Sequence, residues 1–185
     1  MRVGQSKENP RRGTSSSSAG RLPGLHEAWI GFGSNLGDRS ANISRALAAF
    51  GDDLVRVSPI YETAPWGVLD QPWFLNGVAR LHWKSDAAAL LARCLEIEEC
   101  LGRVRGERFG PRIIDLDVLV LGPEAVVEEG LQVPHPGIAD RRSVLEPWAD
   151  LCPDLLVPGT GLTLARLRAS ARSLPGQELR LSEAI

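Results

Sequence analysis

The residues from Trp73 to Trp83 alternate in polarity, and no other feature of the sequence limits the fold as strongly. Successive side chains of a β-strand point to opposite faces of its sheet, so a period of two predicts a strand with one buried face. The odd positions are almost all apolar, whereas the even positions include Phe74, Asn76, Arg80 and His82. We therefore expect a half-buried strand whose odd side chains face the core.

The segments around this strand predict two helices and three more strands. Apolar residues at helical spacing follow Asp38 and Asp86, which can cap a helix, and Gly51 and Gly102 can end the two helices. Further strands are expected at 28–33, 54–61 and 113–121, and the chain after Pro136 reads as helical with breaks at Pro147, Pro153, Pro158 and Pro175. This order of elements is that of a ferredoxin-like α+β sandwich, an antiparallel sheet with helices packed on it.

Length and composition indicate one domain and exclude several classes of partner. We expect the domain at 26–185, after a disordered extension at 1–25 that has almost nothing to bury. The formal net charge of −2 argues against nucleic acid binding, and no apolar run approaches the roughly 20 residues of a membrane span. Three cysteines without metal-binding spacing, Cys94, Cys100 and Cys152, are expected to be buried thiols in a reducing cytoplasm.

Two acids lie two residues apart in the strand predicted at 113–121. The even positions of this strand, Ile114 to Val120, are apolar and should face the core, so Asp115 and Asp117 should project together from the other face. Adjacent carboxylates repel each other unless a cation lies between them, and Mg²⁺ needs few protein oxygens when phosphate is present. The alternative is a solvated polar face paired with local arginines.

Four arginines lead directly into that strand in a loop interrupted by glycines. Arg103, Arg105, Arg108 and Arg112 present guanidinium groups, which match phosphate oxygens with paired hydrogen bonds. Beside a two-carboxylate metal site, such a loop is what phosphoryl transfer requires. The alternative is a solvated basic loop.

Other candidate residues are less specific on their own. Glu98, in the last turn of its helix, could pair with the arginines or a nucleotide, or be an ordinary surface acid. His135, between two prolines, and Arg141 could both reach phosphate, or His135 could be a structural loop residue. Phe74 and Asn76 could stack on a flat heterocycle and bind its edge, or Phe74 could pack beneath the proline-containing loop.

Several short segments together resemble the 6-hydroxymethyl-7,8-dihydropterin pyrophosphokinase family of folate biosynthesis. The resemblance covers about residues 28–160, and its most specific part is GPRIIDLD at 110–117. The supporting segments are GSNLG at 33–37, YETAP at 61–65, FLN at 74–76, LGR at 101–103 and VPH at 133–135.

The resemblance implies a monomeric enzyme whose substrates are ATP and 6-hydroxymethyl-7,8-dihydropterin, whose mobile loops close over ATP, and which releases AMP. Asp115 and Asp117 would hold two Mg²⁺ ions, and Arg103 and Arg112 would act on the phosphates. The ATP site would also include Glu98, Val118, His135 and Arg141. The pterin site would comprise Thr63, Ala64, Trp66, Phe74, Asn76 and the loop aromatic Phe109.

The sequence departs from the family pattern at three places. Ser143 stands where the family usually has an aromatic that forms one side of the pterin site, which predicts weaker pterin binding or replacement by a nearby aromatic. The arginine loop looks a residue shorter than in some relatives, and the extension at 1–25 has no counterpart. The rival hypotheses are a binding module without chemistry and a degenerate family member.

Overall fold

A computed structural model describes residues 24–107, 109–123, 125–171 and 176–183, so most of the predicted extension and Arg108 lie outside the described residues. The main sheet has the strand order β5-β1-β4-β3-β8, with β2 paired to β4 beside β3. Its strands are β1 (His26–Ser34), β2 (Leu54–Val57), β3 (Tyr61–Thr63), β4 (Phe74–Trp83), β5 (Asp115–Leu121) and β8 (Leu179–Leu181). Every pairing is antiparallel, as expected for the predicted ferredoxin-like α+β fold.

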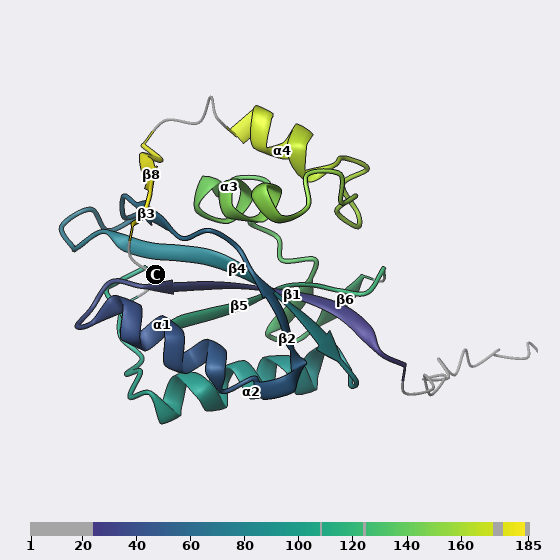
Figure 1. Ribbon diagram of the computed structural model, residues 1–185, viewed down its shortest axis with the longest axis horizontal. Coiled ribbons are helices and arrows are strands. Elements are labelled where there is room, and N and C mark those ends of the chain that lie inside the picture. The colour runs from purple at the N-terminus through teal and green to yellow at the C-terminus, as the bar shows by residue number, and fades with distance from the viewer. Residues whose placement is uncertain (1–23, 108, 124, 172–175, 184–185) are drawn as a thin grey trace, which may run out of the picture.

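Helices cover both faces of this sheet (Figure 1). On one side lie α1 (Arg39–Ala48) and α2 (Ala87–Cys100), and on the other lie α3 (Arg142–Leu151) and α4 (Leu164–Ala171). A 3₁₀ helix, η1 (Gly51–Asp53), and a separate hairpin of β6 (Val126–Glu128) and β7 (Leu131–Val133) complete the described elements. None of the described helices is both long and apolar enough to span a membrane.

The two predicted helices begin as the sequence indicates. The side chains of Asp38 and Asp86 accept hydrogen bonds from the backbone N–H of Ala41 and Ala89, which caps α1 and α2. Gly102 follows α2 with a φ of +83°, a conformation that glycine adopts without strain. Both helices bury their apolar residues in one cluster with Ile30, Leu81 and Leu116 of the sheet.

A second core fills the opposite face of the sheet, which the sequence had predicted to be exposed. Trp29, Val78 and Val120 pack there against α3 and α4, and Trp148 of α3 is fully buried. The prediction of a half-buried β4 is therefore only half right: the odd side chains do face the α1–α2 core, but Val78 and Phe74 on the even face are also buried.

The prediction for Val120 is wrong because β5 contains a bulge. Val118 pairs with Ile30 but Val120 pairs with Trp29, which leaves Leu119 as an extra residue between them. The insertion changes the alternation, so Val120 faces the second core together with Leu119. Asp115 and Asp117 precede the bulge and keep the expected common face.

Two further differences from the expected elements involve prolines. The strand expected at 54–61 is divided into β2 and β3 around Pro59, which has no N–H to donate to a ladder. Pro147, expected to break the helical segment, lies inside α3.

The cysteines also differ from expectation, because Cys94 is buried and Cys152 half-buried but Cys100 is exposed.

Candidate active site

A cavity of about 400 Å³ opens on the α3 face of the sheet, where β1, β3, β4 and β5 meet the arginine loop. Small residues make room for it, because Gly31 and Gly33 of β1 lie between the acids of β5 and Asn76 of β4. The predicted site residues that line it are Thr63, Ala64, Trp66, Phe74, Asn76, Arg103, Phe109, Arg112, Asp115, Asp117 and Arg141. Glu98, Val118 and His135 are not among the lining residues.

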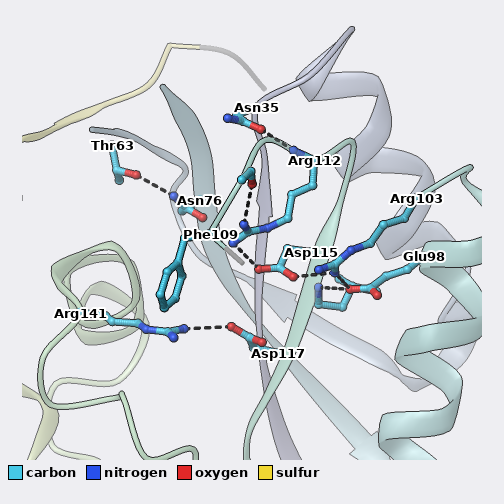
Figure 2. A network of polar contacts seen from close by, with 12 residues as sticks. Asn35, Thr63, Asn76, Glu98, Arg103, Phe109, Arg112, Asp115, Asp117 and Arg141 are labelled. Carbon is cyan, nitrogen blue, oxygen red and sulfur yellow. Dashed lines mark hydrogen bonds and ion pairs between the residues drawn. The ribbon is translucent and has the colours of Figure 1, made fainter. Parts of the chain in front are cut away.

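The two aspartates lie within a cluster of three arginines (Figure 2). Asp115 accepts from Arg103 at 2.5 Å and pairs with the Nη2 atom of Arg112 at 2.7 Å. Asp117 pairs with Arg141 at 3.1 Å. The carboxylates are thus paired with local arginines, as one alternative from the sequence held, but all five groups face the same cavity.

Glu98, which does not line the cavity, joins the arginine loop to β5 through hydrogen bonds. Its side chain is 5% exposed and accepts from the backbone N–H of Leu116 at 2.7 Å and from Arg103. Burial raises the pKa of Glu98, although the Leu116 N–H and the Arg103 charge act in the opposite direction. Glu98 is therefore not the ordinary surface acid of the alternative interpretation; it fixes Arg103 next to Asp115.

His135 and Val118 lie next to the carboxylates without lining the cavity. The backbone N–H of His135 donates to the Leu119 carbonyl at 2.9 Å, and its Nδ1 atom accepts from the Gly137 N–H at 3.0 Å. Burial lowers the pKa of His135, and because its Nδ1 atom accepts a hydrogen bond, the neutral ring carries its proton on Nε2. Val118 has its side chain in the α1–α2 core, which leaves only its backbone available to a nucleotide.

Asp117 has a raised pKa because of burial and then because of the neighbouring charge of Asp115. A cation between the two carboxylates would relieve both effects. No group of three or more acidic, histidine or cysteine side chains in the described ranges could hold a metal ion by itself. A metal here therefore needs oxygens from a ligand as well.

The other end of the cavity combines flat and polar groups. Phe74 is 7% exposed, not the exposed aromatic expected, and the Arg112 guanidinium lies 4.9 Å from its ring centre. Asn76 donates its amide to the Thr63 hydroxyl at 2.7 Å. A Cβ atom at Gly33 would overlap the Asn76 Oδ1 atom, so this glycine sets the position of the amide.

Two aromatic side chains border the cavity on the loop side. Phe109 and Trp66 form an edge-to-face pair with ring centres 5.2 Å apart, and the Arg141 guanidinium lies 5.9 Å from the Trp66 ring centre. Phe109 has a φ of +64°, and a Cβ atom at Gly67 would lie only 3.0 Å from its ring. The arginine loop and the loop after β3 therefore meet directly at Phe109.

Asn35 joins these loops, a role that the sequence did not reveal because GSNLG reads as a tight turn. Its buried side chain donates to Gln71 at 2.9 Å and to the Pro72 carbonyl at 3.0 Å, and accepts from the Arg112 N–H at 2.7 Å. Gln71 in turn donates to the Phe109 carbonyl at 2.7 Å. The only local feature that marks this position is an asparagine within the turn that follows a strand.

Three residues near the C-terminus also line the cavity and were not predicted. Gln177, Glu178 and Leu179 lie beside Thr63 and Ala64, and the Ala64 N–H donates to the Glu178 carbonyl at 2.9 Å. This bond occupies the backbone N–H of Ala64, one of the residues expected at the pterin site. A three-residue strand after four prolines carries no periodic pattern, so sequence reasoning could not find it.

Comparison with known proteins assigns the family. Residues 29–153 match the model of 7,8-dihydro-6-hydroxymethylpterin-pyrophosphokinase. A 2-amino-4-hydroxy-6-hydroxymethyldihydropteridine pyrophosphokinase of Methylorubrum extorquens is 43% identical, over 73% of this chain and 88% of that protein. Its counterpart in Pseudomonas aeruginosa is 42% identical, over 72% of this chain and 85% of the relative.

Solved structures support the fold. The wild-type HPPK-DHPS of Plasmodium falciparum superposes with a TM-score of 0.64 at 14% identity, over 80% of this chain and 43% of that one. This chain thus spans under half of that longer protein. Together with the sequence matches, the likeness shows that the chain belongs to the 7,8-dihydro-6-hydroxymethylpterin-pyrophosphokinase family.

Proposed function

We propose that the cavity around Asp115 and Asp117 is where this chain carries out its family's reaction, transfer of a pyrophosphoryl group from ATP to 6-hydroxymethyl-7,8-dihydropterin. The observation that carries the proposal is that one cavity joins two carboxylates and three arginines at one end to an aromatic and an amide at the other. The first set suits a metal-bound triphosphate, and the second suits a flat heterocycle.

The arginines are the groups that neutralise the triphosphate. Arg103 and Arg112 now share Asp115, and Arg141 pairs with Asp117. Guanidinium groups bind phosphate oxygens as readily as carboxylates, so each arginine can exchange a carboxylate for a phosphate when ATP binds. Glu98 keeps Arg103 in place during this exchange, because it holds both the guanidinium and the Leu116 N–H.

Asp115 and Asp117 would hold Mg²⁺, and the residues present fit that ion. They supply hard carboxylate oxygens from one face of β5, and phosphate oxygens and water complete the shell that Mg²⁺ prefers. When bound, Mg²⁺ polarises the phosphates and offsets their charge. We propose two ions, because the two carboxylates at alternate positions of β5 could each supply an oxygen ligand, with oxygens of ATP and water supplying the rest.

The pterin would lie between Phe74 and the loop aromatics. Phe74 would contact the pterin with the part of its ring that the Arg112 guanidinium does not cover. Asn76, whose amide N–H donates to Thr63, would present its carbonyl oxygen to the pterin. Phe109 and Trp66 border the same space and would exclude water from it once the pterin is bound. The hydroxymethyl group of the pterin would then face the arginines.

The reaction needs positioning more than a strong base. The hydroxymethyl oxygen forms a bond to the β-phosphorus of ATP, the bond from that phosphorus to the α,β-bridging oxygen breaks, and AMP leaves with that oxygen. Arg103 and Arg112 stabilise the charge that develops on the transferred group and on the leaving AMP. The proton of the hydroxyl passes to solvent or to a phosphate oxygen.

Product analysis tests this proposal. The purified chain is incubated with ATP, Mg²⁺ and 6-hydroxymethyl-7,8-dihydropterin, and the phosphorus NMR spectrum is recorded with time. The proposal requires AMP and a pterin diphosphate ester to appear in equal amounts. ADP with a pterin monophosphate would mean simple kinase chemistry, and binding of both substrates without either product would mean a binding module.

A further inference from the structure

The segment Gln177–Leu179 forms a wall of the cavity next to the first turn of α3. It lies beyond residue 153, where the match to the family model ends, so the family pattern does not account for it. Ser143, whose position the family pattern fills with an aromatic, lines the same part of the cavity but has a side chain too short to cover a ring. The Gln177 side chain bonds to the N–H of Arg142, the residue before Ser143, so the C-terminal segment adjoins that position of the cavity.

Two sets of bonds hold this segment against the cavity. On the strand side, Leu179 to Leu181 pair with Thr63 to Tyr61, and Arg180 forms an ion pair with Glu62. On the helix side, the Gln177 side chain accepts from the Arg142 N–H at 2.7 Å and donates to the Asp140 carbonyl at 2.7 Å. The segment is thus fixed to β3 and to the start of α3 at once.

The strand register directs Leu179 into the cavity. Thr63 pairs with Phe74 on one side and with Leu179 on the other. Directly paired residues of antiparallel strands point to the same face of the sheet, so Phe74, Thr63 and Leu179 form one row. Phe74 is assigned above to the heterocycle and Thr63 fixes Asn76 beside it, and Leu179 continues the same row.

We propose that Leu179 is a pterin-binding residue of this chain, whose methyl groups pack against the heterocycle in place of the aromatic absent at Ser143, and that Gln177 positions it. The inference rests on the proposed function, because it takes the ligand of this end of the cavity to be a pterin. An apolar side chain suits a flat ring that needs exclusion of water and no further hydrogen bond there.

Binding of the pterin to two leucine variants tests the inference. Leu179→Ala removes three carbons from the contact surface and should raise the Kd for 6-hydroxymethyl-7,8-dihydropterin about tenfold, with the α,β-methylene analogue of ATP present to prevent turnover. The Kd of the ATP analogue itself should stay within about twofold. Leu181→Ala is the matched control, because Leu181 is on the same strand and face but is 62% exposed and does not line the cavity.

Two further variants separate contact from folding. Leu179→Gln keeps the length of the side chain but not its apolar surface, so it should weaken pterin binding without lowering the melting temperature. Adding Ser143→Phe to Leu179→Ala should restore most of the lost affinity. Equal pterin Kd values for Leu179→Ala and Leu181→Ala would overturn the inference, as would a double variant that binds no better than Leu179→Ala.

The wild-type chain distinguishes failure of the inference from failure of the proposed function. If wild type forms AMP from the pterin and ATP while the Leu179 variants bind the pterin normally, only the role of Leu179 is wrong. If wild type neither binds the pterin nor forms AMP, the function and the inference are wrong together.

Discussion

Replacing Asn35 with alanine should destabilise the chain and separate its two active-site loops. The side chain is 2% exposed and makes three hydrogen bonds, to Gln71, to the Pro72 carbonyl and from the Arg112 N–H. At about 1 kcal/mol each, Asn35→Ala should lower the free energy of unfolding by about 3 kcal/mol. For a chain of this length that corresponds to a melting temperature about 9 °C lower.

Catalysis should fall further than stability alone explains. Arg112 and Phe109 lie on one loop and Gln71 on the other, and Asn35 contacts both loops from a rigid strand end. Without it the arginine and the aromatic are held less well, and kcat/KM for AMP formation should drop about tenfold or more at a temperature where the variant is fully folded.

Asn42→Ala is the control for buried-amide loss. Asn42 is 4% exposed and its side chain makes two hydrogen bonds, to the Leu36 carbonyl and from Arg45, neither of which involves the two loops. It should lose about 2 kcal/mol of stability and keep kcat/KM within about twofold. The reasoning is refuted if Asn35→Ala, measured below its melting transition, keeps the wild-type kcat/KM or loses no more activity than Asn42→Ala.

Two other predictions follow from single contacts. Partial burial and the hydrogen bond to Asp150 raise the pKa of Tyr61, the one tyrosine of the sequence, to about 12. A group whose pKa is raised by folding contributes stability below its pKa in the unfolded chain, here about 10. Tyr61→Phe should therefore be about 1 kcal/mol less stable than wild type at pH 8. Urea unfolding should show this difference in stability vanish as the pH rises from about 10 to about 12. Gly33→Ala should push the Asn76 amide out of place and raise the Kd for the pterin more than that for an ATP analogue, as calorimetry can measure; equal effects on both would contradict the placement of the pterin at Asn76.

Local patterns predicted the first half of the fold well. The caps at Asp38 and Asp86 and the glycine after α2 are chemical signals that act within a few residues, and each one marks the helix end it was expected to mark. The alternation that placed Asp115 and Asp117 on one face also held, because both precede the bulge at Leu119. Neither the bulge nor the burial of the second sheet face has a local signal.

The parts that were missed depend on segments far apart in the chain. Val78 is buried by α3, which follows it by about 70 residues, so its own strand pattern reads as exposed. The sequence around Asn35 predicts only a turn, whereas its side chain joins two loops, since its hydrogen-bond partners Gln71 and Arg112 lie 36 and 77 positions away. Leu179 reaches the cavity through pairing with β3 and through the bonds of Gln177 at the start of α3, both distant in sequence.

The metal requirement of the two aspartates tests the central claim most directly. AMP formation by wild type, Asp115→Asn and Asp117→Asn is measured as a function of Mg²⁺ concentration, with melting temperatures to establish folding. Each asparagine removes a charge while keeping the shape, so both variants should lose at least about a hundredfold in turnover and need more Mg²⁺ to reach what remains. A folded Asp117→Asn variant with wild-type turnover and Mg²⁺ dependence would contradict the assignment of this cavity as the pyrophosphoryl-transfer site.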